Sequence, residues 1–480
     1  MLKNVLNIFS VSAISAGIRF VVEVIIARIV SVEAFGLFAI VTSLIAIFQV
    51  LVSGGVRPIL QRKLAITFNN NNSFEFFEVL YKSLFLFFIV VLVVFSIYKF
   101  VDIRAINSES LSTVDLYFNT ILIGSIATAI LYMVSDIYRV IGNFKSFIFY
   151  KEAIFPIFFL IMVSLVWVFN LINVEYILYA LIASLILSCV LGVVRLKHDL
   201  SKKNIATNKH ELKIFKNKDL LMFWASSEVL GIIWIVRDKF AILSVSEYMS
   251  AADIAVLFIM IRLIMPISMI KSSFNNIISP VIANLSHRRS FDKLSNKYSQ
   301  LTKLLFLFVF PVFAILSTFG PEIVFIVLGE KYKLDLLPTS LLTWSVAVSA
   351  MLGPSGVALQ MCGRPNIESI FLAGSLLAIV PLSMYLVPSF GLVGAILSVY
   401  MLITFVDLLR YFYVKKALHI NAHEEKFGYK VILIMTIALL IIASNFLSPL
   451  YSLVSLILIY SMLFNKEIFS VVKNQKIFKY

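Results

Sequence analysis

Long apolar stretches recur along the whole chain, and short polar connections separate them. Fourteen of these stretches come close to about 17–25 residues, the length that an α-helix needs to cross the hydrocarbon core of a bilayer. The eighth is the longest and contains Pro266, so we expect it to kink there or to continue beyond the membrane. The pattern predicts an all-α integral membrane protein with about 14 transmembrane helices. The stretches lie at 8–30, 35–56, 79–101, 116–138, 149–170, 172–194, 220–245, 252–282, 301–319, 338–361, 367–387, 391–413, 428–446 and 449–465.

The composition agrees with a lipid environment. Hydrophobic residues make up 61% of the 480 residues, charged residues 14%, and the mean hydropathy is +0.99. A soluble chain is roughly 45–50% apolar and about 25% charged, so a soluble globular protein is excluded. The two cysteines lie in separate apolar regions, and the five histidines are scattered in polar loops. We therefore expect no metal site, no disulfide framework and no cofactor.

The basic residues give an orientation. With the N-terminus placed inside, 31 of the 41 Lys and Arg residues, Arg410 among them, fall on cytoplasmic segments and 7 on outside segments. This asymmetry alternates correctly from loop to loop, as the positive-inside rule requires. It predicts a multi-pass protein with both termini in the cytoplasm. The net charge of +15 then belongs to membrane topology, and nucleic acid is not expected as a partner.

The longest basic loop divides the chain after six predicted helices. A faint repeat supports two related halves, because the outside link "IVSVEAFGLFAI" resembles "ILSVSEYMSAADIAVL" after the seventh helix. Transporters are often built from such repeated halves. The predicted domains are an N-terminal six-helix bundle at 1–194, a basic cytoplasmic linker at 195–219, a C-terminal six-helix bundle at 220–413, and two extra helices with a basic tail at 414–480.

Enzyme motifs with a soluble context are absent from the sequence. It contains no GxxxxGK[ST] phosphate loop, no GxGxxG after a strand, no HExxH and no GxSxG. The expected activity is therefore that of a membrane transporter and not of an enzyme, with no catalytic residues. Its work would be done inside the membrane and driven by ion gradients, the membrane potential or the gradient of the substrate.

Charged residues inside the predicted helices are the candidate site. A charge near the bilayer centre costs about 2.5–3.5 kcal/mol on insertion scales, so it persists mainly beside a partner or in a wet cavity. Arg19 and Arg262 lie near the midplane of the first and eighth helices by helical rise. Glu23, one turn after Arg19, can pair with it. Arginine suits an anionic substrate because its planar fork holds phosphate oxygens at two points.

Other charges extend this hypothesis of a cationic, substrate-binding cavity. Each has a structural alternative: the cations can form ion pairs, cluster at the membrane interface or extend to the inner surface, and the acids can couple ions or balance charge. The further candidate cations are Arg237, Lys239 and Lys271. The candidate acids, beside Glu23, are Glu228, Asp238 and Asp407.

Four patches of the sequence follow one another along the chain. They are "ARIVSVEAFGLFAIVTSLIAIFQVLVSGGVRPILQRK", "IVRDKFAILSVSEYMSAADIAVLFIMIRLIMPISMIKSSFNNIISPVIANL", "FPVFAILSTFGPEIVFIVLGEKYK" and "LGPSGVALQMCGRPNIESIFLAGSLLAIVPLSMYLVPSFGLVGAI". In this order they resemble the bacterial polysaccharide flippases of the Wzx type, in the superfamily that includes multidrug and toxin extrusion transporters and lipid II flippases. In the fourth patch the Gln360, Gly363, Arg364 and Pro365 turn, followed by Gly391 and Gly394, follows the family pattern, and in the second Asp238 lies at the usual acidic position.

The resemblance implies two six-helix bundles around a central cavity that works by alternating access. The implied substrate is an oligosaccharide repeat unit on a polyprenyl diphosphate, moved to the outer leaflet of a bacterial inner membrane for surface polysaccharide such as O-antigen. A polysaccharide polymerase and a chain-length regulator are the implied partners. Two alternatives stay open: a multidrug exporter of the same fold, which should carry cavity acids and few cavity bases, and a membrane-embedded polymerase, which commonly needs a long outside loop with catalytic residues.

Overall fold

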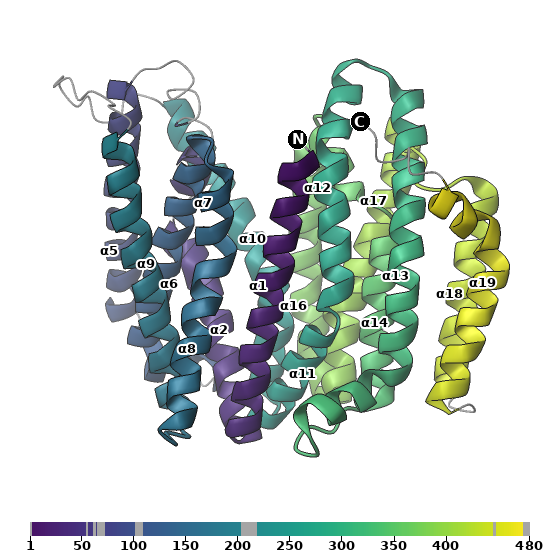
Figure 1. Cartoon of the computed structure of the whole chain (residues 1–480), viewed down its shortest axis with the longest axis horizontal. Helices are drawn as coiled ribbons and strands as arrows, with labels where there is room; N and C mark the ends of the chain where they lie inside the picture. The colour runs from purple at the N-terminus through teal and green to yellow at the C-terminus, as the bar shows by residue number, and fades with distance from the viewer. Residues whose placement is uncertain are drawn as a thin grey trace. The chain divides into compact units, whose positions relative to one another are not determined.

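The computed structural model describes residues 2–473 except 54–55, 61–63, 65–72, 101–108, 203–217 and 445–447, and in parts of some helices it describes the backbone alone. Within these ranges the regular elements are all helices, and no strand occurs (Figure 1). The chain divides into two compact units, 1–255 and 256–480. The division falls within α11 (Ala251–Leu263).

The first unit is built around α2, which packs against α5, α6 and α10. The apolar side chains of α2 are largely buried. Ser125 of α6 donates a hydrogen bond to the Ile45 carbonyl of α2 at 3.1 Å, which joins the two helices at close range. The elements are α1 (Leu2–Ile29), α2 (Val32–Ser53), α3 (Val56–Ile59), α5 (Ser73–Phe100), α6 (Glu109–Val140), α7 (Phe144–Ile148), the π-helix η3 (Phe149–Ala153), α8 (Ile154–Val168), α9 (Val174–Lys202) and α10 (Lys218–Tyr248).

The second unit is built around α13, which packs against α12, α14 and α19. Small hydroxyl side chains link its helices by hydrogen bonds. Such links are expected in a membrane, where the hydrophobic effect does not drive helices together. Ser340, for example, donates to the Ser317 carbonyl at 2.9 Å. After α11 the elements are α12 (Met265–His287), α13 (Phe291–Leu328), α14 (Leu336–Met351), α15 (Ser355–Met361), α16 (Pro365–Ala395), the π-helix η4 (Ile396–Met401), α17 (Leu402–Leu418), α18 (Glu425–Ser444) and α19 (Pro449–Lys473).

The all-α membrane fold class is confirmed. Over the described residues, each predicted apolar stretch lies mostly on one helix or on a consecutive run of helices. Among the described residues, nine helices are long and apolar enough to cross a bilayer, and ten if the bent pair α11–α12 forms one span. The chain is thus a multi-pass membrane protein, and the figure of about 14 spans stays a prediction.

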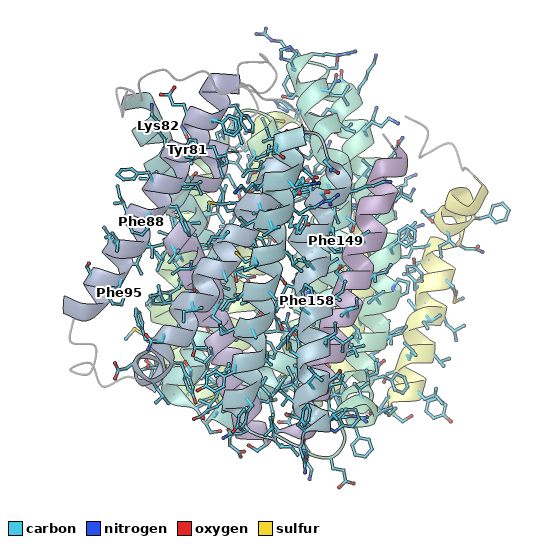
Figure 2. All side chains as sticks on the ribbon, turned by 60° about the vertical axis from the view of Figure 1, so that its left-hand side comes forward. Tyr81, Lys82, Phe88, Phe95, Phe149 and Phe158 are labelled. Carbon is cyan, nitrogen blue, oxygen red and sulfur yellow. The ribbon has the colours of Figure 1, made fainter. Side chains whose placement is uncertain are left out.

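One face of α5 shows where lipid would lie. Tyr81, Phe88 and Phe95 follow one another at heptad spacing, and all three side chains are exposed (Figure 2). Lys82 forms an ion pair with Glu78 on the same helix, near its N-terminal end. An apolar stripe that ends in a charged pair is what a lipid-facing helix requires.

Proline bends the helix that the sequence marked as overlong. The axes of α11 and α12 differ by 45°, and the break at Ile264 comes two residues before Pro266, which lies in the first turn of α12. Proline has no N–H for the preceding turn and its ring clashes with that turn, so the helix restarts there. The predicted kink is confirmed.

The C-terminal helices α18 and α19 lie side by side and pack on α13 through aromatic side chains (Figure 1). The rings of Phe306 and Phe464 are 4.8 Å apart, and those of Phe310 and Tyr460 are stacked at 4.8 Å. The Tyr460 hydroxyl donates to the Leu307 carbonyl at 3.0 Å. This packing fixes α19 to the second unit.

The two links of the faint sequence repeat meet inside the first unit. Gly36 of α2 lies so close to α11 that a Cβ atom there would stand 1.8 Å from the Ala251 carbonyl oxygen. Gly36→Ala is expected to push α2 and α11 apart and to destabilise the protein by about 1–3 kcal/mol, as overpacking does. Thermal unfolding in detergent measures this. Gly17→Ala is the control, since no atom lies within 4 Å of its Cβ; an equal effect of both changes would contradict the close contact.

Candidate functional site

A network of buried charges joins four helices of the second unit. Lys271 of α12 donates to Asp407 of α17 at 3.3 Å and to the Ser349 hydroxyl of α14 at 2.6 Å. Ser349 in turn donates to the same carboxylate oxygen of Asp407. The sequence analysis proposed Lys271 as a substrate cation and Asp407 as a coupling acid, and the structure brings the two together.

Arg410 holds the other half of this network. Its Nη1 donates to Asp407 at 2.7 Å and its Nη2 to Glu368 of α16 at 2.9 Å. Arg410 is 4% exposed, so its side chain lies inside the unit, whereas the sequence analysis counted it among the cations of a cytoplasmic segment. Asp407 and Arg410 share a helix face because they are three residues apart. That spacing was the one signal from which the sequence could have found the pair.

The network carries two cations and two carboxylates and is formally neutral. Charges taken out of water are tolerated when each has an opposite partner and its remaining polar atoms are hydrogen-bonded. Here each charge has an opposite partner, and Arg410 Nε has no hydrogen-bond partner among the described residues. The arrangement can tie α12, α14, α16 and α17 together, and gain or loss of a proton would break its charge balance. For Lys271 the contacts describe an ion pair; its proposed role with substrate stays a prediction.

Arg19 lies in the first unit against η3. Its Nη2 is 3.8 Å from the Glu152 carboxylate and 3.5 Å from the Glu152 carbonyl oxygen. Pro156 explains why that carbonyl accepts a side-chain contact, because proline has no N–H to donate to the residue four positions earlier. Sequence reasoning paired Arg19 with Glu23, which is half-buried on the same helix; it did not find Glu152.

Arg262 lies at the bend between α11 and α12. Its guanidinium carbon is 4.5 Å from the centre of the Phe258 ring, and Nη1 is 3.5 Å from the Met265 sulfur. A cation over an aromatic face is favourable, the more so away from water. Arg262 is half-buried, like Arg19.

The remaining candidates lie on α10. Lys239 and Asp238 form an ion pair at 3.0 Å, with Asp238 exposed, and Arg237 is half-buried. The side chain of Glu228 lies outside the described residues. These neighbours fit the interfacial cluster that the sequence analysis kept as an alternative to a substrate contact.

The sequence analysis did not find an ion pair in the first unit. Arg57 of α3 donates to Asp136 of α6 at 2.8 Å, and its guanidinium lies 4.7 Å from the centre of the Tyr132 ring. Asp136 is almost fully buried.

Among the described residues, no group of three or more His, Cys, Asp or Glu side chains could hold a metal ion.

His423, in the link between α17 and α18, gives a prediction about pH. Its Nε2 lies 2.7 Å from the Met351 carbonyl oxygen, whereas its buried Nδ1 has no hydrogen-bond partner. Burial lowers the pKa of His423, and the hydrogen bond to Met351 opposes this. The unfolded chain therefore takes up a proton where the folded protein does not, and this residue reduces the stability of the fold as the pH falls below about 6.5.

The measurement is thermal unfolding at several pH values between neutral and mildly acidic. Wild type should lose more stability on acidification than His423→Gln, which has no group to protonate at this position. His287→Gln is the control, because His287 is exposed. Identical pH dependence in wild type and His423→Gln would contradict the argument.

Solved membrane proteins share this fold. The lipid II flippase MurJ in an inward closed conformation is 15% identical, with a TM-score of 0.64 over 96% of this chain and 99% of that chain. An inward-facing multidrug resistance MATE family transporter of the MOP superfamily is 12% identical, with a TM-score of 0.63 over 84% of this chain and 94% of the other. Identities this low show the fold alone.

A third similar structure is a MOP superfamily transporter from Pyrococcus furiosus, whose binding pocket is described as having reverse polarity that suggests a different function. It is 14% identical, with a TM-score of 0.58 over 87% of this chain and 96% of that chain. No curated protein sequence matches the chain. The model of the family described as "Polysaccharide biosynthesis protein" matches residues 25–335. Since this match spans more than half of the 480 residues, the chain belongs to that polysaccharide biosynthesis family, on a fold shared with MOP superfamily transporters.

Proposed function

We propose that this protein is a flippase that moves a polyprenyl-diphosphate-linked oligosaccharide repeat unit from the cytoplasmic to the outer leaflet by alternating access. The observation that carries the proposal is the family match: a polysaccharide biosynthesis family on a chain folded like a lipid II flippase. Synthesis of a surface polymer needs a step that carries a lipid-linked intermediate across the bilayer. A protein made of apolar helices without a soluble enzyme module suits that step.

The charges fit an anionic cargo. Arg19 and Arg262 are half-buried guanidinium groups within apolar helices, and we propose that both contact the diphosphate during transit. Arginine can hold phosphate oxygens at two points and stays charged away from water. A membrane potential that is negative inside would also favour outward movement of the anion, by about 2.3 kcal/mol per charge per 100 mV.

The same proposal includes location and partners. The asymmetry of Lys and Arg supports both termini in the cytoplasm, and the proposed substrate implies a bacterial inner membrane. A polysaccharide polymerase and a chain-length regulator would act on the flipped product, which is the repeat unit that a surface polymer such as O-antigen requires.

The proposal can be tested directly in living cells. Removing the protein should abolish the surface polysaccharide and leave the lipid-linked repeat unit in the cytoplasmic leaflet, and plasmid-borne wild type should restore both. The multidrug alternative, prompted by the shared fold of the MATE transporter, predicts instead normal polysaccharide and raised sensitivity to cationic dyes. A membrane-embedded polymerase predicts that single repeat units reach the outer leaflet and remain unjoined.

A further inference from the structure

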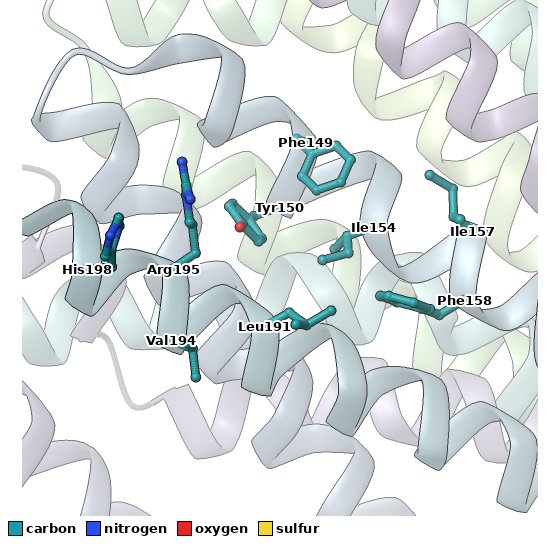
Figure 3. A pocket seen from close by; sticks show the side chains of 9 residues that line it. All are labelled: Phe149, Tyr150, Ile154, Ile157, Phe158, Leu191, Val194, Arg195 and His198. Carbon is teal, nitrogen blue, oxygen red and sulfur yellow. The ribbon is translucent and has the colours of Figure 1, made fainter.

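A groove runs along the outer surface of the first unit between α8 and α9. It has a volume of about 470 Å³, and η3 forms part of its wall. Figure 3 shows Arg195 and His198 at one end and Ile157 and Phe158 at the other. The groove therefore has a polar end, and apolar side chains line the rest of it. This arrangement suits the binding of an amphiphile.

The apolar length opens to the surroundings of the protein. Ile157, Leu191 and Val194 line it, and all three are exposed. In a chain that crosses the bilayer, exposed aliphatic side chains within a helix face acyl chains. A hydrocarbon chain in this groove would cover them without having to enter the interior of the unit.

The buried residue Tyr138 holds the polar end of the groove in place. The hydroxyl of Tyr138, a fully buried residue, donates to Asp199 at 3.0 Å, and the Tyr138 ring stacks on Tyr150 of the groove at 5.3 Å. Asp199 in turn lies 3.5 Å from Nε of Arg195 and 3.5 Å from Nδ1 of His198. The side chain of Arg195 is 60% exposed, so its two terminal nitrogens can reach a phosphate oxygen.

The charge at this end fits one phosphate. Two further cations lie near η3, since Arg139 and Lys151 are each 5.6 Å from the ring of Phe147 in α7, the helix directly before η3. Asp199 offsets part of this charge. The result suits an anionic phosphate headgroup beside Arg195.

We propose that this groove binds an anionic membrane phospholipid, with its phosphate at Arg195 and His198 and one acyl chain along Ile157, Phe158, Leu191 and Val194. Such a lipid binds the folded protein and not the unfolded chain, so it stabilises the fold in proportion to its concentration. Neither of the proposed transport contacts, Arg19 and Arg262, lines the groove, so lipid binding can be tested without measuring transport.

The test is thermal unfolding of the full chain in detergent, titrated with phosphatidylglycerol or phosphatidylcholine. Phosphatidylglycerol should raise the melting temperature of wild type and phosphatidylcholine should do so less. In Arg195→Gln/His198→Gln its apparent affinity should fall about fivefold or more, since one Arg near an anionic lipid contributes about 1 kcal/mol. Val194→Trp, which fills the groove, should also weaken binding. Lys197→Gln, with an equal change in charge outside the groove lining, should bind like wild type.

Three results would overturn the proposal. The first is equal stabilisation by both lipids, and the second is an equal loss of binding in Lys197→Gln and Arg195→Gln/His198→Gln. The third is stronger, Arg195-dependent stabilisation by a polyprenyl diphosphate than by phosphatidylglycerol, which would assign the groove to the transported class of lipid. If Arg195→Gln/His198→Gln does not fold, Val194→Trp, which leaves every charge in place, decides alone whether the groove is the binding site.

Discussion

Arg410→Met is expected to destabilise the second unit by about 3–5 kcal/mol, the range found when one partner of a buried ion pair is removed. Arg410 donates to both Asp407 and Glu368, and methionine replaces the aliphatic stem of arginine but carries no guanidinium group and no charge. The change leaves the buried network with two carboxylates and Lys271 as the one cation of the original set. Thermal unfolding in detergent should show a large fall in melting temperature.

A second substitution distinguishes lost charge balance from lost packing. Glu368→Gln/Arg410→Met removes one charge of each sign, so it should recover part of the stability lost in Arg410→Met, and the double-mutant cycle measures the coupling. Lys416→Met is the control, because Lys416 is exposed on the same helix and should change stability by less than about 0.5 kcal/mol. An Arg410→Met protein that unfolds like the control would contradict the network.

Arg19→Gln and Arg262→Gln are each expected to slow transport of the lipid-linked oligosaccharide about tenfold or more. The reason is that a hydrogen bond to a charged group is worth about 1.5–3 kcal/mol, which the neutral amide does not replace. The initial rate in proteoliposomes measures the effect, with the amount of folded protein matched by gel filtration. Arg262→Gln should also lose the cation–aromatic contact with Phe258.

Lys415→Gln is the matched control, since it removes one positive charge from an exposed position on α17. It should transport at the wild-type rate. Full transport by both arginine variants would leave the flippase proposal standing and would reject the two residues as substrate contacts. Glu152→Gln is informative as well: if Arg19 serves only its ion pair, this variant should impair the protein as much as Arg19→Gln does.

The fold class could be predicted because lipid imposes a simple rule on the sequence. A helix must stay apolar for the thickness of the bilayer, so stretch length and charge position are enough to find the elements. The bend before Pro266 was also readable, since proline acts on its own turn of helix. The π-helix η3 could not be predicted, because the sequence before Pro156 is compatible with either a plain kink or a π-bulge.

The partners of the buried charges could not be predicted in the same way. Arg19 contacts Glu152, which lies 133 residues away, and only the packing of α1 against η3 brings them together. Local spacing indicated only that Glu23 can pair with Arg19, and that pairing stays a prediction. Arg410 sits at the end of an apolar stretch where a cytoplasmic cation is expected, and nothing local shows that Glu368 of α16 turns it inward.

The central claim is best tested by transport in proteoliposomes that contain the purified protein and a fluorescent polyprenyl-diphosphate oligosaccharide. An impermeant glycosidase or reductant added outside reports how much substrate reaches the outer leaflet. The account predicts exposure of substrate from the inner leaflet at a rate far above that of protein-free liposomes, and no uptake or release of cationic dyes. Exposure no faster than in protein-free liposomes with an authentic donor lipid, together with movement of cationic dyes, would contradict it.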